Sequence, residues 1–162
     1  MSGRTVMKRR APASFTPIWM RIASDIMFAL YIALLFRLTV FRDNFSINNF
    51  MLGGNVNLTV FKDLIDIIRR GGAFYFFYLL LGNIAAFLPL GAYLAYRTKM
   101  HLISTMLTGA AVSFIIEFLQ FAFDVGVTEI DDLILNTLGA FAGAAAVRMV
   151  SALAAKKREQ KN

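Results

Sequence analysis

Five polar side chains within two apolar stretches of this sequence are of types that do chemistry. Glu117 and Gln120 lie in SFIIEFLQ, and Asp131, Asp132 and Asn136 lie in IDDLILN. Neighbouring carboxylates can act as general acid and base or hold Mg²⁺, whereas amides bind polar groups of a ligand by hydrogen bonds. The residues therefore predict either an acid–base site, with Glu117, Asp131 and Asp132 as catalytic candidates, or a binding site.

Membrane-spanning helices must position these groups. The composition is 58% hydrophobic, above the roughly 45–50% of soluble domains. Four windows approach the ~20 residues that a helix needs to cross a bilayer. We predict an all-α fold, a polytopic membrane protein with four transmembrane helices in one bundle. The predicted spans are residues 22–41, 74–96, 102–123 and 130–153.

Basic residues gather beside the ends of these predicted helices. The 17 Lys and Arg against 10 Asp and Glu would suit nucleic acid only if the cations shared one surface. They instead precede the first span, fill the turn between the second and third, and follow the last. By the positive-inside rule these clusters are cytoplasmic. We therefore expect both termini on the cytoplasmic side of the membrane, and no nucleic-acid partner.

The segments around the spans complete the predicted organisation. Residues 1–20 form a basic cytoplasmic arm, residues 21–153 the four-helix membrane domain, and residues 154–162 a basic cytoplasmic tail. The stretch NLTVFKDLIDIIRRGG predicts a short external amphipathic helix between the first two spans, capped by Asn57 or Thr59. Whether this helix is a lid or a connection stays open.

Spacing places the polar groups on helical stripes, because residues three and four apart share one face. Gly139 and Gly143 also form a GxxxG surface suited to close helix contact, and Gly91 in the second span permits a close neighbour in the same way. Pro89 predicts a kink in the second span. The stripes are Ser113, Glu117, Gln120 and Asp124 on the third span, and Asp132, Asn136, Gly139 and Gly143 on the fourth.

Depth brings the candidate residues together. Glu117 lies about 9 Å of helix rise before the external end of its span. Arg37 lies in the outer third of the first span and Asn83 near the middle of the second. Arg37 either snorkels to the interface or pairs with Glu117. We predict one outward-open cavity, with binding residues Arg37, Asn83, Glu117, Gln120, Asp131, Asp132 and Asn136.

Other residues limit the chemistry and the packing. Cysteine is absent and His101 is the only histidine, so we expect no disulfide, no thiolate or histidine metal site and no cofactor. Asp25 is expected to pair with Arg21, four residues earlier. The short turn after the second span predicts that the second and third spans pack as antiparallel neighbours.

Three motifs carry a resemblance to a known family. GNIAAFLPLGAYLA, EFLQ and EIDDLILNTLGAFAG resemble the VanZ-like family pattern N…F.P.G, E..Q and D(D)…N..G over residues 74–146. The family often has an arginine in the turn before the acidic pair, and here FAFDVGVTEI has none. The matching positions are Asn83, Phe87, Pro89, Gly91, Glu117, Gln120, Asp131, Asp132, Asn136 and Gly139.

The resemblance implies a bacterial polytopic membrane protein linked to low-level resistance to teicoplanin, a lipidated glycopeptide. Two functions stay open beside it. In the first, the cavity binds an amphiphilic partner, either a lipid-linked envelope precursor or a lipoglycopeptide, and membrane lipids surround the protein as further partners. Alternatively, Glu117 with Asp131 or Asp132 catalyses a reaction on an envelope lipid. A structural accessory role is a third option, a transporter is less favoured, and the oligomeric state is open.

Overall fold

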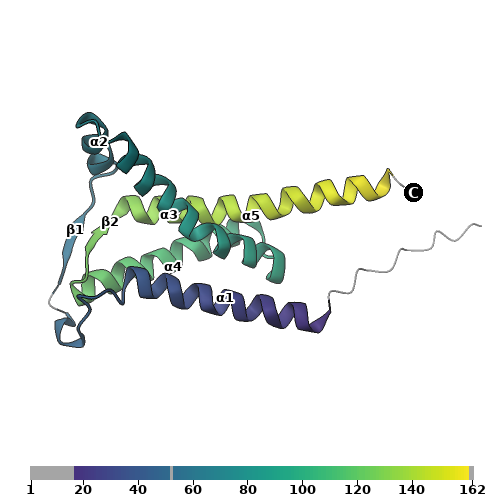
Figure 1. The fold of residues 1–162 in the computed structure, drawn as a ribbon, viewed down its shortest axis with the longest axis horizontal. Coiled ribbons are helices and arrows are strands. Elements are labelled where there is room, and N and C mark those ends of the chain that lie inside the picture. Colours follow the sequence, from purple (N-terminus) through teal and green to yellow (C-terminus); the bar gives the residue numbers. More distant parts are fainter. Residues whose placement is uncertain (1–16, 52, 161–162) are drawn as a thin grey trace, which may run out of the picture.

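The computed structural model describes residues 17–51 and 53–160 and forms a helical bundle with a small cap at one end (Figure 1). A 3₁₀ helix spans Ile47–Asn49, and a π-helical turn at Leu94–Thr98 extends the third helix. The helices are α1 Ile18–Thr39, α2 Lys62–Arg69, α3 Ala73–Tyr93, α4 Leu102–Phe123 and α5 Ile130–Glu159, and the strands are β1 Asn55–Asn57 and β2 Val127–Glu129.

The four predicted spans are confirmed as helices long and apolar enough to cross a membrane. The third has the predicted bounds, whereas the first begins at Ile18 and the fourth continues to Glu159. Residues 154–159 of the predicted tail are therefore helical, and residues 18–20 of the predicted arm belong to α1. Residues 1–16 and 161–162 lie outside the described part of the chain.

Helix α5 is the central element and packs against both α3 and α4 (Figure 1). Small residues allow the close approach, because a methyl carbon at Gly139 or Gly143 would lie 2.2 or 2.1 Å from a carbonyl oxygen of α3. Gly91 of α3 faces the backbone of Ala140 in the same way. The expected pairing of the second and third spans is minor, since α3 has far more contacts with α5 than with α4.

The apolar core lies where α1, α3, α4 and α5 meet. Tyr31 of α1 donates a 2.6 Å hydrogen bond to the Ala86 carbonyl of α3. Pro89 lies inside α3, and its side chain is exposed. Many large apolar side chains remain exposed along the spans, as expected for surfaces that face lipid. The buried core residues are Leu35, Val40, Phe87, Leu90, Ile116 and Ala140.

The cap consists of α2, β1 and β2, and it lies at the end of the bundle opposite the start of α1 and the end of α5 (Figure 1). Strands β1 and β2 pair in parallel, with Asn55 opposite Val127 and Asn57 opposite Glu129. This ladder ties the loop after α1 to the α4–α5 connection. The expected capping of α2 by Asn57 or Thr59 is wrong, because Phe61 is the N-cap residue and no side chain caps this helix. Asn57 instead accepts the Thr59 N–H at 3.1 Å and donates to the Asp63 carboxylate at 2.7 Å.

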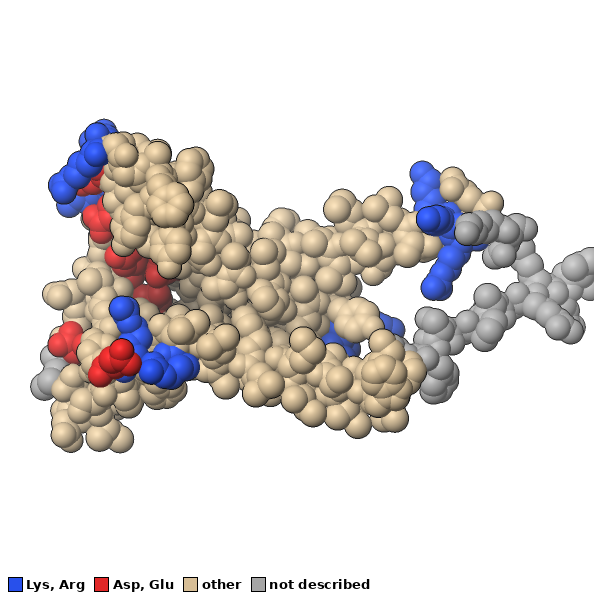
Figure 2. All heavy atoms as spheres, in the orientation of Figure 1, with Lys and Arg blue, Asp and Glu red and all other residues tan. Residues whose placement is uncertain are grey.

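On the face shown in Figure 2, the Lys, Arg, Asp and Glu side chains gather toward the two ends of the molecule, and most of the surface between them belongs to other residues. Lys156, Lys157 and Arg158 occupy the last turn of α5. Near the start of the bundle, Asp25 pairs with Arg97 at 2.9 Å and accepts a hydrogen bond from the Tyr93 hydroxyl. The expected Asp25–Arg21 pair is wrong, because Arg97 reaches Asp25 from the neighbouring helix.

Candidate functional site

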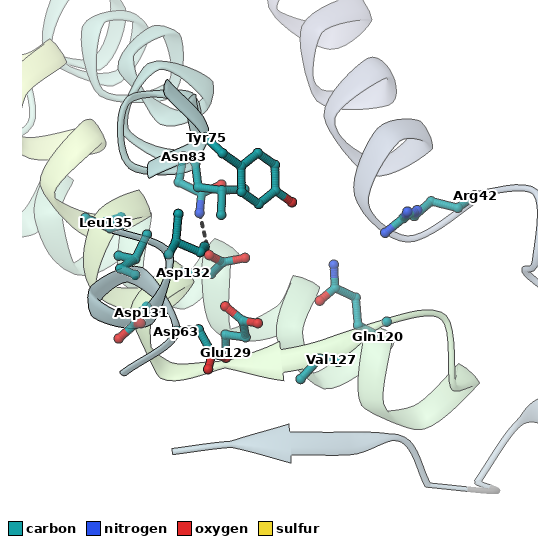
Figure 3. Close-up of a pocket in the computed structure, with 14 residues that line it drawn as sticks. Arg42, Asp63, Tyr75, Asn83, Gln120, Val127, Glu129, Asp131, Asp132 and Leu135 are labelled. Carbon is teal, nitrogen blue, oxygen red and sulfur yellow. Dashed lines mark hydrogen bonds between the residues drawn. The ribbon is translucent and has the colours of Figure 1, made fainter. Parts of the chain in front are cut away.

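An acidic cavity lies between the cap and the ends of the long helices (Figure 3). Its volume is about 400 Å³, within the roughly 300–1,000 Å³ of small-molecule sites. Its lining residues are Arg42, Asp63, Leu64, Ile67, Tyr75, Leu79, Asn83, Gln120, Gly126, Val127, Glu129, Asp131, Asp132 and Leu135.

Asp132 and Asn83 form the wall where α5 meets α3. The Asn83 side-chain amide donates a hydrogen bond to the Asp132 carboxylate, and both side chains line the acidic cavity (Figure 3). Asp132 lies in the first turn of α5, where the helix dipole favours a negative charge. The predicted depth of these residues in the membrane put both of them in one cavity, and in the structure both line the acidic cavity.

Asp131 also lines the acidic cavity, but its carboxylate anchors the cap. It is only 3% exposed, and its Oδ1 accepts the backbone N–H of Phe61 at 2.8 Å. Phe61 precedes α2 with a left-handed φ of 55°, so its N–H needs a partner other than the helix itself. Asp131 therefore fixes the start of α2 above the bundle.

Glu117 lies beneath β2 and is 5% exposed. Its Oε2 accepts the Glu129 N–H at 3.0 Å, and its backbone carbonyl accepts the Thr128 hydroxyl at 3.0 Å. Glu117 does not line the acidic cavity. It lines an apolar groove of about 200 Å³ formed with Leu58, Phe114, Phe118, Phe121, Thr128, Glu129, Ile130 and Leu133.

Gln120 and Asn136 lie on the buried faces of α4 and α5. The Gln120 amide nitrogen donates to the Thr39 carbonyl at 3.2 Å, and Gln120 lines the acidic cavity. Asn136 donates to the Ser113 hydroxyl at 3.0 Å in the contact between α4 and α5. Asn136 thus lies deeper in the bundle than the acidic cavity and is not among its lining residues.

Arg37 lies outside the acidic cavity. Its guanidinium donates to the Phe41 carbonyl and pairs with Asp43 at 3.2 Å. Of the two alternatives for Arg37, the structure has the side chain reaching the end of its own helix, without a pair to Glu117. Four of the seven predicted binding residues line the cavity: Asn83, Gln120, Asp131 and Asp132.

Sequence reasoning missed Arg42, Asp63 and Glu129 as lining residues. Glu129 immediately precedes α5, so the run EIDD places three carboxylates at one helix start, and that spacing was the available signal. Burial, reinforced by the charges of Asp132, Asp63 and Asp131, raises the pKa of Glu129 to about 6. Asp63 lies on the polar side of α2, whose Leu64 is buried.

The positions of the three carboxylates named as catalytic candidates suit ligand binding better than acid–base chemistry between them. Glu117 and Asp131, two of the three catalytic candidates, hold backbone N–H groups of the cap, and Glu117 and Asp132 line different spaces. Asp132 and Glu129 are the carboxylates that face the acidic cavity in Figure 3, with Gln120 and Arg42 across from them.

The fold and the site define a multi-pass membrane protein with an acidic cavity beneath a small cap. The family model described as VanZ/LLP1 matches residues 28–151, from α1 to the later part of α5, and the chain belongs to this family. Searches of curated proteins and of solved structures give no match.

Proposed function

We propose that this protein, in the bacterial cytoplasmic membrane, holds an amphiphilic envelope molecule with its polar head in the acidic cavity. The candidates are a lipid-linked envelope precursor and a lipoglycopeptide, and binding would contribute to teicoplanin-type resistance or to envelope homeostasis. On this proposal the cap faces outward and both termini face the cytoplasm, in agreement with the basic last turn of α5.

The observation that carries the proposal is that Glu129 lines both a polar and an apolar space. On one side is the acidic cavity, and on the other is the apolar groove walled by phenylalanines of α4. An amphiphile needs such neighbouring environments for its head and its chain. The exposed Phe114 and Phe118 would extend the groove toward the surrounding lipid.

Photocrosslinking with acylated ligands tests this proposal. The purified protein is exposed to a lipid-linked precursor and to a lipoglycopeptide, each with a photoreactive group in its acyl chain. We expect labels on the peptides of α4 and α5 that form the apolar groove. Leu133→Trp fills the groove and Asp132→Ala alters the cavity. Each should lower the labelling by about tenfold, which corresponds to a loss of roughly 1.4 kcal/mol in the free energy of binding.

Leu138→Trp is the matched control, because Leu138 is a leucine of the same helix that is 48% exposed and lies outside the groove. It should label as the unaltered protein does. Labelling of the groove peptides that is unchanged by both Leu133→Trp and Asp132→Ala would refute the proposal.

A further inference from the structure

The acidic cavity has an excess of negative charge that the described residues do not neutralise. Four carboxylates line it, and Arg42 is the one cation among its described lining residues. The excess therefore remains available to a ligand. The ion pairs found within residues 17–51 and 53–160 lie elsewhere and are Arg37–Asp43 and Arg97–Asp25.

Neutral N–H groups hold three of these carboxylates. Asp131 accepts from the Phe61 backbone, Asp63 from Asn57, and Asp132 from Asn83. Such bonds orient a carboxylate but leave its charge in place, and partly buried charges without a counter-charge are costly. Burial, together with the same crowding of negative charge, raises the pKa of Glu129. A cation entering the cavity would relieve it.

Gln120 independently indicates a ligand with hydrogen-bond donors. Its side chain is only 8% exposed, and its nitrogen faces the Thr39 carbonyl, which can only accept. This fixes the orientation of the amide and leaves Oε1 buried, with no donor among the described residues. Gln120 extends toward the acidic cavity in Figure 3, so a donor from a bound head group would satisfy it.

The spacing of the carboxylates suits an organic cation. Within the described residues, no three acidic or histidine side chains converge closely enough to share a metal ion. An ammonium group has three donors and can contact acceptors distributed around a cavity of about 400 Å³. A phosphate would meet the same carboxylates as like charges.

Resting on the function proposed above, we propose that the head group bound in the acidic cavity carries a primary ammonium, which donates to Asp132, Glu129 and the Gln120 carbonyl. The cavity thus selects amine-bearing amphiphiles over those that present a phosphate first. Specificity comes from attraction of the ammonium and from repulsion of the anion together.

Three photoactivatable amphiphiles test this selection on the full chain in neutral detergent. They share one acyl chain and differ only in the head, which is a primary ammonium, an uncharged sugar or a phosphate. We expect the ammonium probe to label the peptides around the acidic cavity at least about tenfold more than the phosphate probe, as one charge-assisted contact implies.

Asp132→Asn combined with Glu129→Gln should bring the three probes within about twofold of one another, since the charge that discriminates is gone. Glu129→Gln alone removes no side-chain hydrogen bond found among the described residues and should shift the preference in the same direction. This single variant keeps the test valid if the double variant fails to fold. Asp66→Asn, on the same helix as Asp63 but outside the acidic cavity, should keep the full preference.

The outcomes separate the two proposals. Equal labelling of the cavity peptides by all three probes, or stronger labelling by the phosphate probe, would overturn the ammonium selection and leave amphiphile binding standing. Absence of cavity labelling with every probe would overturn both. A preference for ammonium that survives Asp132→Asn with Glu129→Gln would also overturn the selection.

Discussion

The carboxylates of this site divide into those that hold the cap and those that face the acidic cavity. Glu117 and Asp131 accept backbone N–H groups from β2 and from the start of α2. Asp132 and Glu129 line the acidic cavity and accept no backbone N–H from the cap in the described part of the chain, whereas Asp131 both lines the cavity and holds the cap. A buried backbone N–H left without an acceptor costs about 1–3 kcal/mol, so the first pair has a structural role that does not depend on any ligand.

The pH dependence of stability should report on Glu129. Its pKa is raised from 4.5 to about 6 in the folded protein, so the folded state binds its proton more tightly than the unfolded state. The resulting stabilisation is complete below about pH 4.5 and is lost as the pH rises through about 6. The carboxylates whose charges act on Glu129 are Asp132 and Asp131 of α5 and Asp63 of α2.

Thermal unfolding in detergent between about pH 4.5 and about pH 7 measures this effect. Relative to the unaltered protein, Glu129→Gln should gain stability as the pH rises, because the glutamine never takes the unfavourable charge. Glu159→Gln, at the exposed end of α5, is the control and should follow the unaltered protein. If Glu129→Gln keeps the same pH profile as the unaltered protein, Glu129 does not titrate as described.

Spacing along a helix predicted the location of the polar residues better than their partners. The stripe of Ser113, Glu117 and Gln120 is buried on α4, as a period of three and four residues implies. Their bonding partners come from α5 for Ser113, from β2 for Glu117 and from the end of α1 for Gln120, and the sequence does not predict which of these elements meet. Arg37 differs, because its partner Asp43 is local and lies in the loop directly after α1.

Helix α5 determines the element-scale architecture, because small residues let it approach the α3 backbone. Apolar length alone predicted the four spans, since the bilayer sets how long a crossing helix must be. It could not predict which helices touch. Strands of three residues, such as β1 and β2, have too few positions for alternation to predict them, and they pair over a long sequence separation.

A pair of glycine substitutions tests the contact between α3 and α5. A methyl carbon at Gly139 would lie 2.2 Å from the Ile84 carbonyl oxygen, so Gly139→Ala must push the helices apart. We expect a loss of roughly 1–3 kcal/mol in the free energy of unfolding. Gly82→Ala is the matched control on α3, where an added methyl meets open space. It should be neutral or stabilise by less than about 1 kcal/mol.

Unfolding of both variants in the same detergent gives the comparison. Equal stability of Gly139→Ala and Gly82→Ala would contradict the close packing of α5 against α3. A lower stability of Gly139→Ala alone would agree with it.

At the scale of the whole molecule, the two ends of the bundle differ in charge and in structure. One end carries the cap and the acidic cavity, and the other carries the basic last turn of α5 (Figures 1 and 2). The 30 residues of α5 extend about 45 Å, which is longer than a hydrocarbon core of about 30 Å. The sequence predicted basic clusters beside the helix ends and a cavity between the helices, but not the part of the cavity wall that Asp63 and Glu129 supply from the cap.

The most direct test of this account is the accessibility of a single cysteine in the acidic cavity, in intact cells. The chain has no cysteine, so Val127→Cys, which is on β2 and lines the cavity, introduces one reactive thiol. We expect a membrane-impermeant maleimide to label it from outside and an acylated ligand to slow that labelling. Lys156→Cys, in the last turn of α5, should react only after permeabilisation. Labelling of Val127→Cys only after permeabilisation, or at a rate that no acylated ligand changes, would contradict an outward cavity that holds an amphiphile.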